Sequence, residues 1–162
     1  MDDLVTERLV LHPLSGAEAE RLVAREPGPD DRWAVDYPTD GDVAAARRFL
    51  ALRAERGDPG LFCNYEIRQG DGGQAIGGLG FHGPVDEDDT VTIGYGLIPA
   101  ARGHGYATEA LRALLALARA HGATRVVGDA DAGNIASQRV MAAAGMRLVA
   151  TTDQLKFYAI SW

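Results

Sequence analysis

Four segments of the chain have apolar residues at the spacing of an amphipathic helix. Each starts at a capping residue or a glycine turn, and most stop at or just before a glycine. The predicted helices cover residues 15–25, 39–57, 106–122 and 134–144. The third has the strongest apolar face, with Ala107, Leu111, Leu114, Leu115 and Ala118 directed inward. We therefore expect the third to be the longest helix.

Short alternating or β-branched runs predict the strands. They cover residues 8–11, 61–68, 74–81, 91–97, 124–130, 146–151 and 154–162. Residues 70–73 read as a turn that joins the second and third strands in a hairpin, and the last two strands form a closing hairpin. Pro99 ends the fourth strand because proline has no amide proton for the ladder.

The composition is that of an ordinary globular protein. With 162 residues, 46% hydrophobic and 24% charged, the chain fits a single domain, residues 1–162, and excludes disordered, collagen-like and disulfide-scaffold classes. Cys63 is the single cysteine, Met1 is followed by acidic residues, and no apolar run approaches a membrane span. We expect a cytoplasmic protein without a membrane partner.

Charge argues against one class of partner. Sixteen basic and 23 acidic side chains give a net charge of −7, the wrong sign for a protein that binds phosphate backbones. Nucleic acid is therefore not an expected partner. An acidic surface attracts cationic ligands such as amines, although modest negative charge also serves solubility alone.

Residues 102–107, with the sequence RGHGYA, lie between the proline-terminated strand and the third helix. Glycines let the backbone approach a ligand, and the free amides and dipole of a helix N-terminus favour a pyrophosphate. One alternative is that Gly103 and Gly105 only make a tight turn. A dinucleotide-binding fold fits poorly, because the third glycine position holds Thr108 and the preceding strands read as hairpins.

At these residues the chain resembles the GNAT superfamily of acetyl-CoA-dependent N-acetyltransferases. The pyrophosphate loop of that family reads Arg/Gln-x-x-Gly-x-Gly/Ala and is matched by Arg102, Gly105 and Ala107. Nearly the whole chain looks like the branch of the ribosomal-protein-alanine N-acetyltransferases. The similar segments, in order, are Thr6-Glu7-Arg8-Leu9, Phe81-His82-Gly83-Pro84, Ile93-Gly94-Tyr95, Gly103 to Leu111, Asn134-Ile135-Ala136-Ser137 and Ala144-Gly145-Met146.

The resemblance implies a fold, a cosubstrate and a set of binding residues. The fold is an α/β (α+β) one, with a mixed, mostly antiparallel sheet of six or seven strands, splayed between the fourth and fifth strands to admit the pantetheine arm, and about four helices. Acetyl-CoA is the expected cosubstrate. Its diphosphate would bind to Arg102 and the amides of Gly103, His104, Gly105, Tyr106 and Ala107, and its pantetheine to backbone groups of Leu97 and Ile98.

Three further residues receive roles from the resemblance. Asn134 is expected to contact the cofactor and Ser137 to protonate the departing thiolate, although both types are also common in the first turn of a helix. The backbone amide near Tyr95 is expected to stabilise the oxyanion, placed by a local irregularity that Gly94 and Gly96 permit.

The base that deprotonates the amine is an open question. Many relatives carry a glutamate just before Ile-Gly-Tyr or shortly after the Gly-Phe of the sixth strand, where this chain has Thr92 and the run 148–150. Glu66, Asp129 and Asp36 are candidates, each better explained as a solvated charge.

Three other observations bear on the site. His82 either faces the acceptor amine or is merely solvated, and Cys63 is expected to be a small buried hydrophobe, without an acetyl-enzyme. No set of side chains has metal-ligand spacing, so we expect no metal.

The resulting hypothesis is direct transfer of an acetyl group from acetyl-CoA to a primary amine, at a peptide or protein N-terminus. One alternative acceptor is a small amine such as an antibiotic or an amino acid. A non-catalytic acyl-CoA-binding module is the alternative from another class. Either a monomer or a homodimer is compatible with the sequence, and residues 27–39 and 82–90, which would shape the acceptor cleft, carry no motif.

Overall fold

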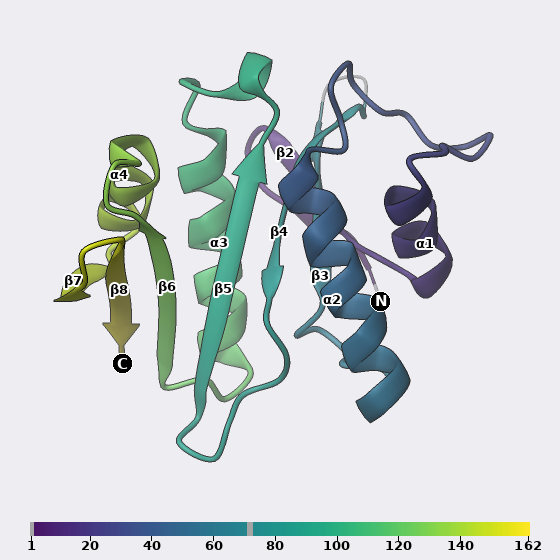
Figure 1. Cartoon of the computed structure of the whole chain (residues 1–162). Helices are drawn as coiled ribbons and strands as arrows, with labels where there is room; N and C mark the ends of the chain where they lie inside the picture. Colours follow the sequence, from purple (N-terminus) through teal and green to yellow (C-terminus); the bar gives the residue numbers. More distant parts are fainter. Residues whose placement is uncertain (1, 71–72) are drawn as a thin grey trace.

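A computed structural model describes residues 2–70 and 73–162 (Figure 1). Within these residues the helices are α1 (Gly16–Ala24), α2 (Asp40–Arg56), α3 (Tyr106–Ala120) and α4 (Ile135–Ala143), with a 3-10 turn, η1, at Pro99–Ala101. The strands are β1 (Leu4–Val5), β2 (Leu9–Pro13), β3 (Asn64–Gln69), β4 (Ala75–Phe81), β5 (Thr90–Leu97), β6 (Arg125–Asp131), β7 (Arg147–Thr151) and β8 (Leu155–Ser161).

All eight described strands form one open sheet in the order β1-β2-β3-β4-β5-β6-β8-β7. Every neighbouring pair is antiparallel except β5 and β6, which are parallel. The predicted mixed, mostly antiparallel fold with four helices is confirmed, with one strand more than expected. That strand is β1, whose two residues are too few to show any periodicity.

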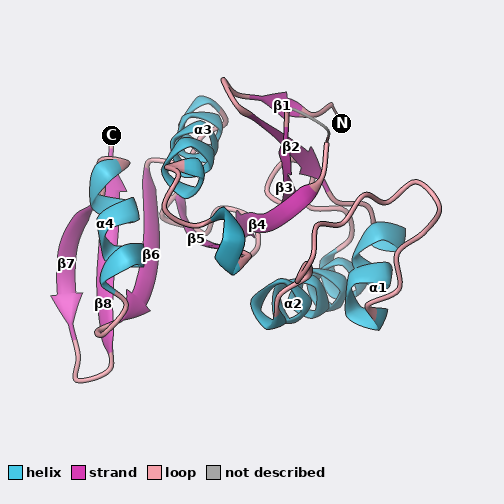
Figure 2. Ribbon diagram, turned by 90° about the horizontal axis from the view of Figure 1, so that it is seen from above, coloured by secondary structure: helices cyan, strands magenta, loops and turns pink. Residues whose placement is uncertain are grey.

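Helices cover both faces of the sheet. Figure 2 shows α1 and α2 on one side of β2 to β4 and α3 on the other. Helix α4 packs on β6, β7 and β8 and also contacts α3. The core lies between these layers, and its most completely buried side chains are Leu9, Leu11, Ile67, Leu111, Leu114, Val126 and Met141. Each such side chain stabilises the fold by roughly 1.5 to 3 kcal/mol.

The helix predicted to be longest is not. Helix α2 has 17 residues and α3 has 15, so that expectation was wrong. Helix α2 carries several arginines and only one apolar stripe, so its apolar periodicity is weaker than that of α3 although the helix is longer. The capping boxes at Ser15 and Thr39, which predicted the starts of α1 and α2, are both present.

The sheet opens between β5 and β6, as predicted. Their pairing covers only Thr90–Thr92 with Arg125–Val127, although β5 continues to Leu97. Beyond that point β6 turns away from β5 (Figure 1). On its other edge β6 pairs with β8 along its whole length. One edge of the second half of β5 therefore has no strand partner among the described residues.

The two predicted hairpins are confirmed by the pairing of β3 with β4 and of β7 with β8. Residues 71–72, in the middle of the predicted turn, lie outside the described residues. The closing hairpin joins the sheet through β8, which lies between β6 and β7. Of the helices described, none combines the length and the apolar character that a membrane crossing requires.

Candidate active site

The loop before α3 has the backbone that its glycines allow. Gly103 and Gly105 both have φ of 80°, a left-handed conformation that costs other residues roughly 1 to 2 kcal/mol. The loop turns the chain from η1 into α3, which begins at Tyr106. Arg102 donates from Nε to the carbonyl oxygen of Leu97, 3.2 Å away, and so connects the loop with the end of β5.

The N-terminus of α3 differs from the other helix starts. Helices α1, α2 and α4 have side-chain caps from Ser15, Thr39 and Asn134, whereas α3 begins at Gly105 without one. The first amides of α3 thus have no capping oxygen from the described chain. An anion is the ligand that such amides and the helix dipole favour.

Arg8 and Glu109 hold this loop from the N-terminal segment. Arg8 donates from Nε to Glu109 at 2.7 Å and from Nη1 to the carbonyl of His104 at 2.8 Å, and its guanidinium lies 4.7 Å from the centre of the Tyr106 ring. The Thr6 hydroxyl donates to the same carboxylate at 2.6 Å.

Partial burial raises the pKa of Glu109, but hydrogen bonds from Thr6 and Arg8 outweigh it and keep that pKa below its usual value. Glu109 therefore stays ionised and is neutralised by Arg8. Neither residue was assigned a role by the sequence analysis. The only signal was the resemblance of residues 6–9 to the family, which says nothing of a contact about a hundred residues away.

The open edge of β5 presents backbone groups of alternate residues. His82 donates its amide to the Thr92 carbonyl, and Ile98 donates to Ile76, so even-numbered residues of this strand face β4. Tyr95 and Leu97 consequently direct their amides to the edge that faces β6, where pairing has ended. Ile98, the other residue expected to bind the pantetheine, differs from Leu97, because its carbonyl oxygen accepts a hydrogen bond from the amide of Ala101. Both backbone groups of Ile98 are thus engaged within the chain.

The expectation of an irregular backbone at Gly94 and Gly96 is wrong. The register between β4 and β5 runs from Gly77–Leu97 to Phe81–Ile93 without a shift. The amide of Tyr95 is exposed on the open edge because β6 diverges, and no bulge is needed to place it.

Tyr95 also contributes its side chain, which the sequence analysis missed. Its hydroxyl lies 2.8 Å from Oγ of Ser137 and 2.9 Å from the Ser137 carbonyl oxygen, and so joins β5 to the first turn of α4. Burial raises the pKa of Tyr95, so the phenol remains protonated at neutral pH. Two hydroxyl groups therefore lie together across the opening of the sheet.

Asn134 is the N-cap of α4. Its side-chain oxygen accepts from the amide of Ser137 at 3.1 Å. The capping interpretation that the sequence left open is therefore confirmed. A contact between Asn134 and a cofactor stays a prediction.

The three carboxylates considered as bases differ in their surroundings. Glu66 is 5% exposed, and its two oxygens accept from the Tyr37 hydroxyl at 3.0 Å and from Arg68 at 2.7 Å. Asp36 is exposed in the loop before α2, and Asp129 is exposed on β6. Glu66 therefore has a structural role, and Asp36 and Asp129 are surface charges.

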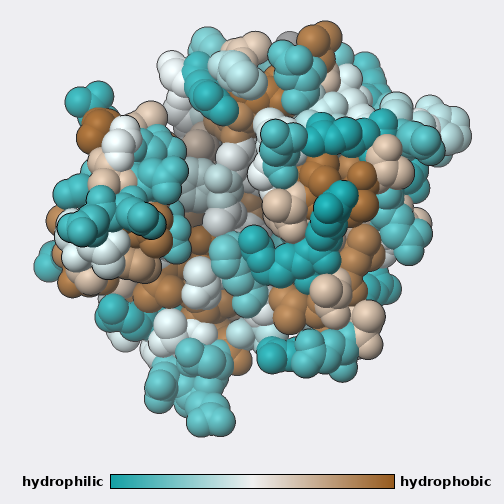
Figure 3. Space-filling model, in the orientation of Figure 1, coloured by the Kyte–Doolittle hydropathy of each residue, from teal (hydrophilic) through white to brown (hydrophobic). Residues whose placement is uncertain are grey.

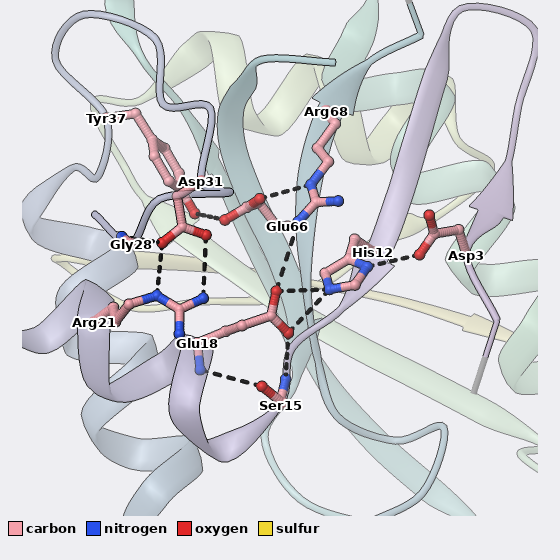
Figure 4. Close-up of polar contacts among 10 residues, drawn as sticks. All are labelled: Asp3, His12, Ser15, Glu18, Arg21, Gly28, Asp31, Tyr37, Glu66 and Arg68. Carbon is pink, nitrogen blue, oxygen red and sulfur yellow. Dashed lines mark hydrogen bonds and ion pairs between the residues drawn. The ribbon is translucent and has the colours of Figure 1, made fainter. Parts of the chain in front are cut away.

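Glu66 belongs to a polar network that holds the segment before α2 against the sheet (Figure 4). Glu18 contacts His12 and Arg68, and Arg21 pairs with Asp31 at 2.6 Å. Arg21 holds the pKa of Asp31 below its usual value, although partial burial opposes this shift. This network positions Tyr37 at the adjoining cavity.

A cavity of about 200 Å³ lies beside β4 and β5 on the α2 side. Figure 3 shows this hollow over the second half of β5 as a pale, weakly polar surface with hydrophilic side chains over α2 beside it. Its lining includes Tyr37, Asp42, Arg48, Asn64, His82 and Tyr95, and four glycines, Gly78, Gly80, Gly94 and Gly96. The second half of β5 therefore borders both the cavity and the open edge, to which Tyr95 and Leu97 direct their amides.

Cys63 is buried, as predicted. Burial raises the pKa of its thiol to about 11, so very little thiolate forms at neutral pH. Among residues 2–70 and 73–162, no group of three or more histidine, cysteine or acidic side chains is placed to hold a metal ion.

Comparisons with known proteins agree with this geometry. The family model of the GNAT acetyltransferase domain matches residues 8–147. No curated protein sequence is similar enough to the chain to count as a relative.

Many solved structures share the fold. An acetyltransferase from Agrobacterium tumefaciens is 24% identical, with a TM-score of 0.69 over 100% of this chain and 95% of its own. RimL, a ribosomal L7/L12 α-N-protein acetyltransferase in complex with coenzyme A, is 19% identical, with a TM-score of 0.70 over 99% and 98%. The microcin C7 self-immunity acetyltransferase MccE, in complex with acetyl-CoA and AMP, is 17% identical, with a TM-score of 0.65 over 97% and 94%.

Proposed function

The chain belongs to the GNAT acetyltransferase family, and on that premise we propose that it transfers the acetyl group of acetyl-CoA to the primary amine at a peptide or protein N-terminus. The observation that carries this proposal is the opening of the sheet beside β5, next to the uncapped N-terminus of α3. The shared fold of RimL, a ribosomal L7/L12 α-N-protein acetyltransferase, supports an N-terminal acceptor.

Acetyl-CoA would bind along this opening. Its diphosphate would meet the amides of residues 103–107 and the positive charge of Arg102, with Arg8 holding the loop. Its pantetheine arm would lie along the open edge of β5 and bond to the amide of Leu97. Asn134, at the start of α4, would face the same arm from the other side.

Direct transfer would proceed in two bond changes. The amine nitrogen bonds to the thioester carbonyl carbon, and the oxygen that gains negative charge is stabilised by the Tyr95 amide. The carbon–sulfur bond then breaks with its electron pair on sulfur, and the thiolate takes a proton from the hydroxyl pair of Ser137 and Tyr95, which regains one from solvent. The proton that the amine loses passes to solvent. A thiol has a pKa near 8.5, so a hydrogen bond from a weak acid is sufficient.

The acceptor amine would approach from the cavity on the α2 side. The cavity is large enough for one amino-acid residue or a small molecule, and residues of α2 form part of its lining. Tyr37 and Thr39 from the segment 27–39, and His82 from the loop 82–90, line it, so both loops expected to shape the cleft contribute to the cavity.

Thiol release from acetyl-CoA would test the proposal. Purified protein would be offered peptides with free and with blocked N-termini, and a set of small amines. Turnover with free peptide N-termini is expected. Turnover confined to small amines would replace the peptide acceptor with the small-amine alternative, and acetyl-CoA binding with no turnover would leave a non-catalytic binding module.

A further inference from the structure

His82 stands at the junction of the acceptor cavity and the strand that would hold the thioester. It directly follows β4, and its amide donates to the Thr92 carbonyl at 2.8 Å, so the backbone is fixed against β5. The ring lies over Gly94, since a β-carbon built there would be 2.9 Å from Nε2. His82, Gly94 and Tyr95 line the same cavity. The imidazole is thus one residue along β5 from the amide that would stabilise the oxyanion.

The ring is available to a ligand. In residues 2–70 and 73–162 neither of its nitrogens has a hydrogen-bond partner, and the residue is exposed at the mouth of the cavity. A bulkier residue than glycine at position 94 would displace the ring. The sequence therefore leaves room for an unpaired imidazole beside the backbone of β5.

The charges around the ring keep it neutral. Partial burial and the nearby Arg48 of α2 lower the pKa of His82 below its usual value, and Asp129 of β6 opposes this shift. The other titratable groups that line the cavity are Asp42 of α2 and the tyrosines of β3, β5 and the loop before α2. A neutral imidazole at pH 7 is able to accept a proton.

The other candidates in the cavity are less suited to this task. Both oxygens of Glu66 are engaged by Tyr37 and Arg68. Asp42 is 8% exposed, and one of its oxygens caps α2 through the amide and hydroxyl of Thr39. His82 is the titratable group of this lining that combines a free nitrogen with a position beside Tyr95.

We propose that Nε2 of His82 accepts the proton that the acceptor amine loses as it attacks the thioester. This inference rests on the proposed acetyl transfer. As the nitrogen–carbon bond forms, the nitrogen gains positive charge and its N–H becomes strongly acidic. The proton passes to Nε2, the carbon–sulfur bond breaks with its electron pair on sulfur, and the imidazolium returns its proton to water after the amide product has formed.

The pH profile of kcat at a saturating concentration of acceptor tests this role, with the fastest peptide from the thiol-release assay as the acceptor. The ratio kcat/KM would also report the ionisation of the free acceptor amine, whose pKa is near 8. Wild-type activity should fall at low pH, with a midpoint below about 6.5, because the protonated ring cannot accept a proton. His82→Gln should lower kcat about 100-fold or more and remove this limb. His121→Gln, at the exposed end of α3, is the matched control and should keep both the rate and the profile.

Substitutions of two charged residues near His82 add a second test, because they should shift the midpoint of the acidic limb only if His82 itself accepts the proton. Arg48→Gln removes a positive charge, so the midpoint should rise. Asp129→Asn removes a negative charge, so the midpoint should fall. Acetyl-CoA affinity and the melting temperature of each variant would show that cofactor binding and folding are intact.

The outcomes separate the two proposals. Wild-type turnover with a folded His82→Gln variant that keeps its rate and acidic limb would overturn the role of His82 and leave acetyl transfer intact. Midpoints that stay constant in the Arg48 and Asp129 variants would also overturn it. If the wild type released no thiol with any amine, acetyl transfer and the role of His82 would fall together.

Discussion

The hydroxyl of Tyr95 lies 2.8 Å from Oγ of Ser137, and this contact joins β5 to α4 across the open part of the sheet. The two residues are 42 positions apart in the sequence. In the proposed mechanism the sulfur of acetyl-CoA lies where the two halves of the sheet separate, so this pair of hydroxyls would donate a hydrogen bond to the departing thiolate.

Ser137→Ala should therefore lower kcat about 10-fold to 100-fold and change the KM for acetyl-CoA little, because the hydrogen bond matters chiefly in the transition state. Tyr95→Phe should have a similar effect, and the double variant should lose less than the product of the two, since the hydroxyls act as a pair. Steady-state kinetics would measure this. An unchanged kcat in folded Ser137→Ala would make water the proton donor.

Gly105→Glu should weaken acetyl-CoA binding by well over tenfold, that is, by more than about 1.4 kcal/mol, as measured by calorimetry. The substitution places a side chain and a negative charge where the diphosphate is expected. Gly105→Ala is the matched control, because it introduces the backbone strain of a φ of 80° without the charge. Equal affinities of the two variants would argue against a phosphate at this turn.

Arg8→Ala should reduce acetyl-CoA affinity about fivefold to tenfold, because the loop loses the hydrogen bond to the His104 carbonyl and Glu109 loses its counter-charge. Arg8 is 43% exposed at its side chain, so the free energy of unfolding should change little. Arg119→Ala, near the other end of the same helix, is the control. Calorimetry and chemical denaturation would separate the two effects.

Gly96→Ala should raise the KM for the acceptor and leave the KM for acetyl-CoA unchanged. A β-carbon at Gly96 meets no atom within 4 Å, so the methyl group would project into the cavity without disturbing the fold. The expected increase is about tenfold, the size of the effect of one methyl group in a fitted pocket. A raised KM for acetyl-CoA with an unchanged acceptor KM would assign the cavity to the cosubstrate.

Cys63→Ala should keep most of its turnover, and intact-mass measurement should detect no acetylated enzyme. The thiol is buried with a pKa raised to about 11, so it is a poor nucleophile at neutral pH. The lost packing should cost roughly 1 kcal/mol of unfolding free energy. Stoichiometric acetyl-Cys63 in the wild type would replace direct transfer by a covalent route.

Local signals were enough to predict most of the elements and the glycine-containing loop at residues 102–107. The capping boxes at Ser15 and Thr39 and the left-handed glycines 103 and 105 depend on contacts within a few residues, so the sequence states them directly. Apolar periodicity located α3 and its inward face for the same reason. It also located α2, since the predicted residues 39–57 agree with Asp40–Arg56, but the weaker apolar face of this helix led to the wrong expectation that α3 is the longer of the two.

Tertiary structure decided which residues meet in the site. Arg8 reaches Glu109 and Tyr95 reaches Ser137 because the sheet order brings distant segments together. Glu66 changed from a candidate base to a structural residue because Tyr37 and Arg68 occupy both its oxygens, and His82 became the stronger candidate because its ring lies over Gly94. The open edge of β5 exists because β6 pairs with it only from Thr90 to Thr92 and then diverges. Such relationships depend on strand order and side-chain placement over long distances, which no local pattern of residues encodes.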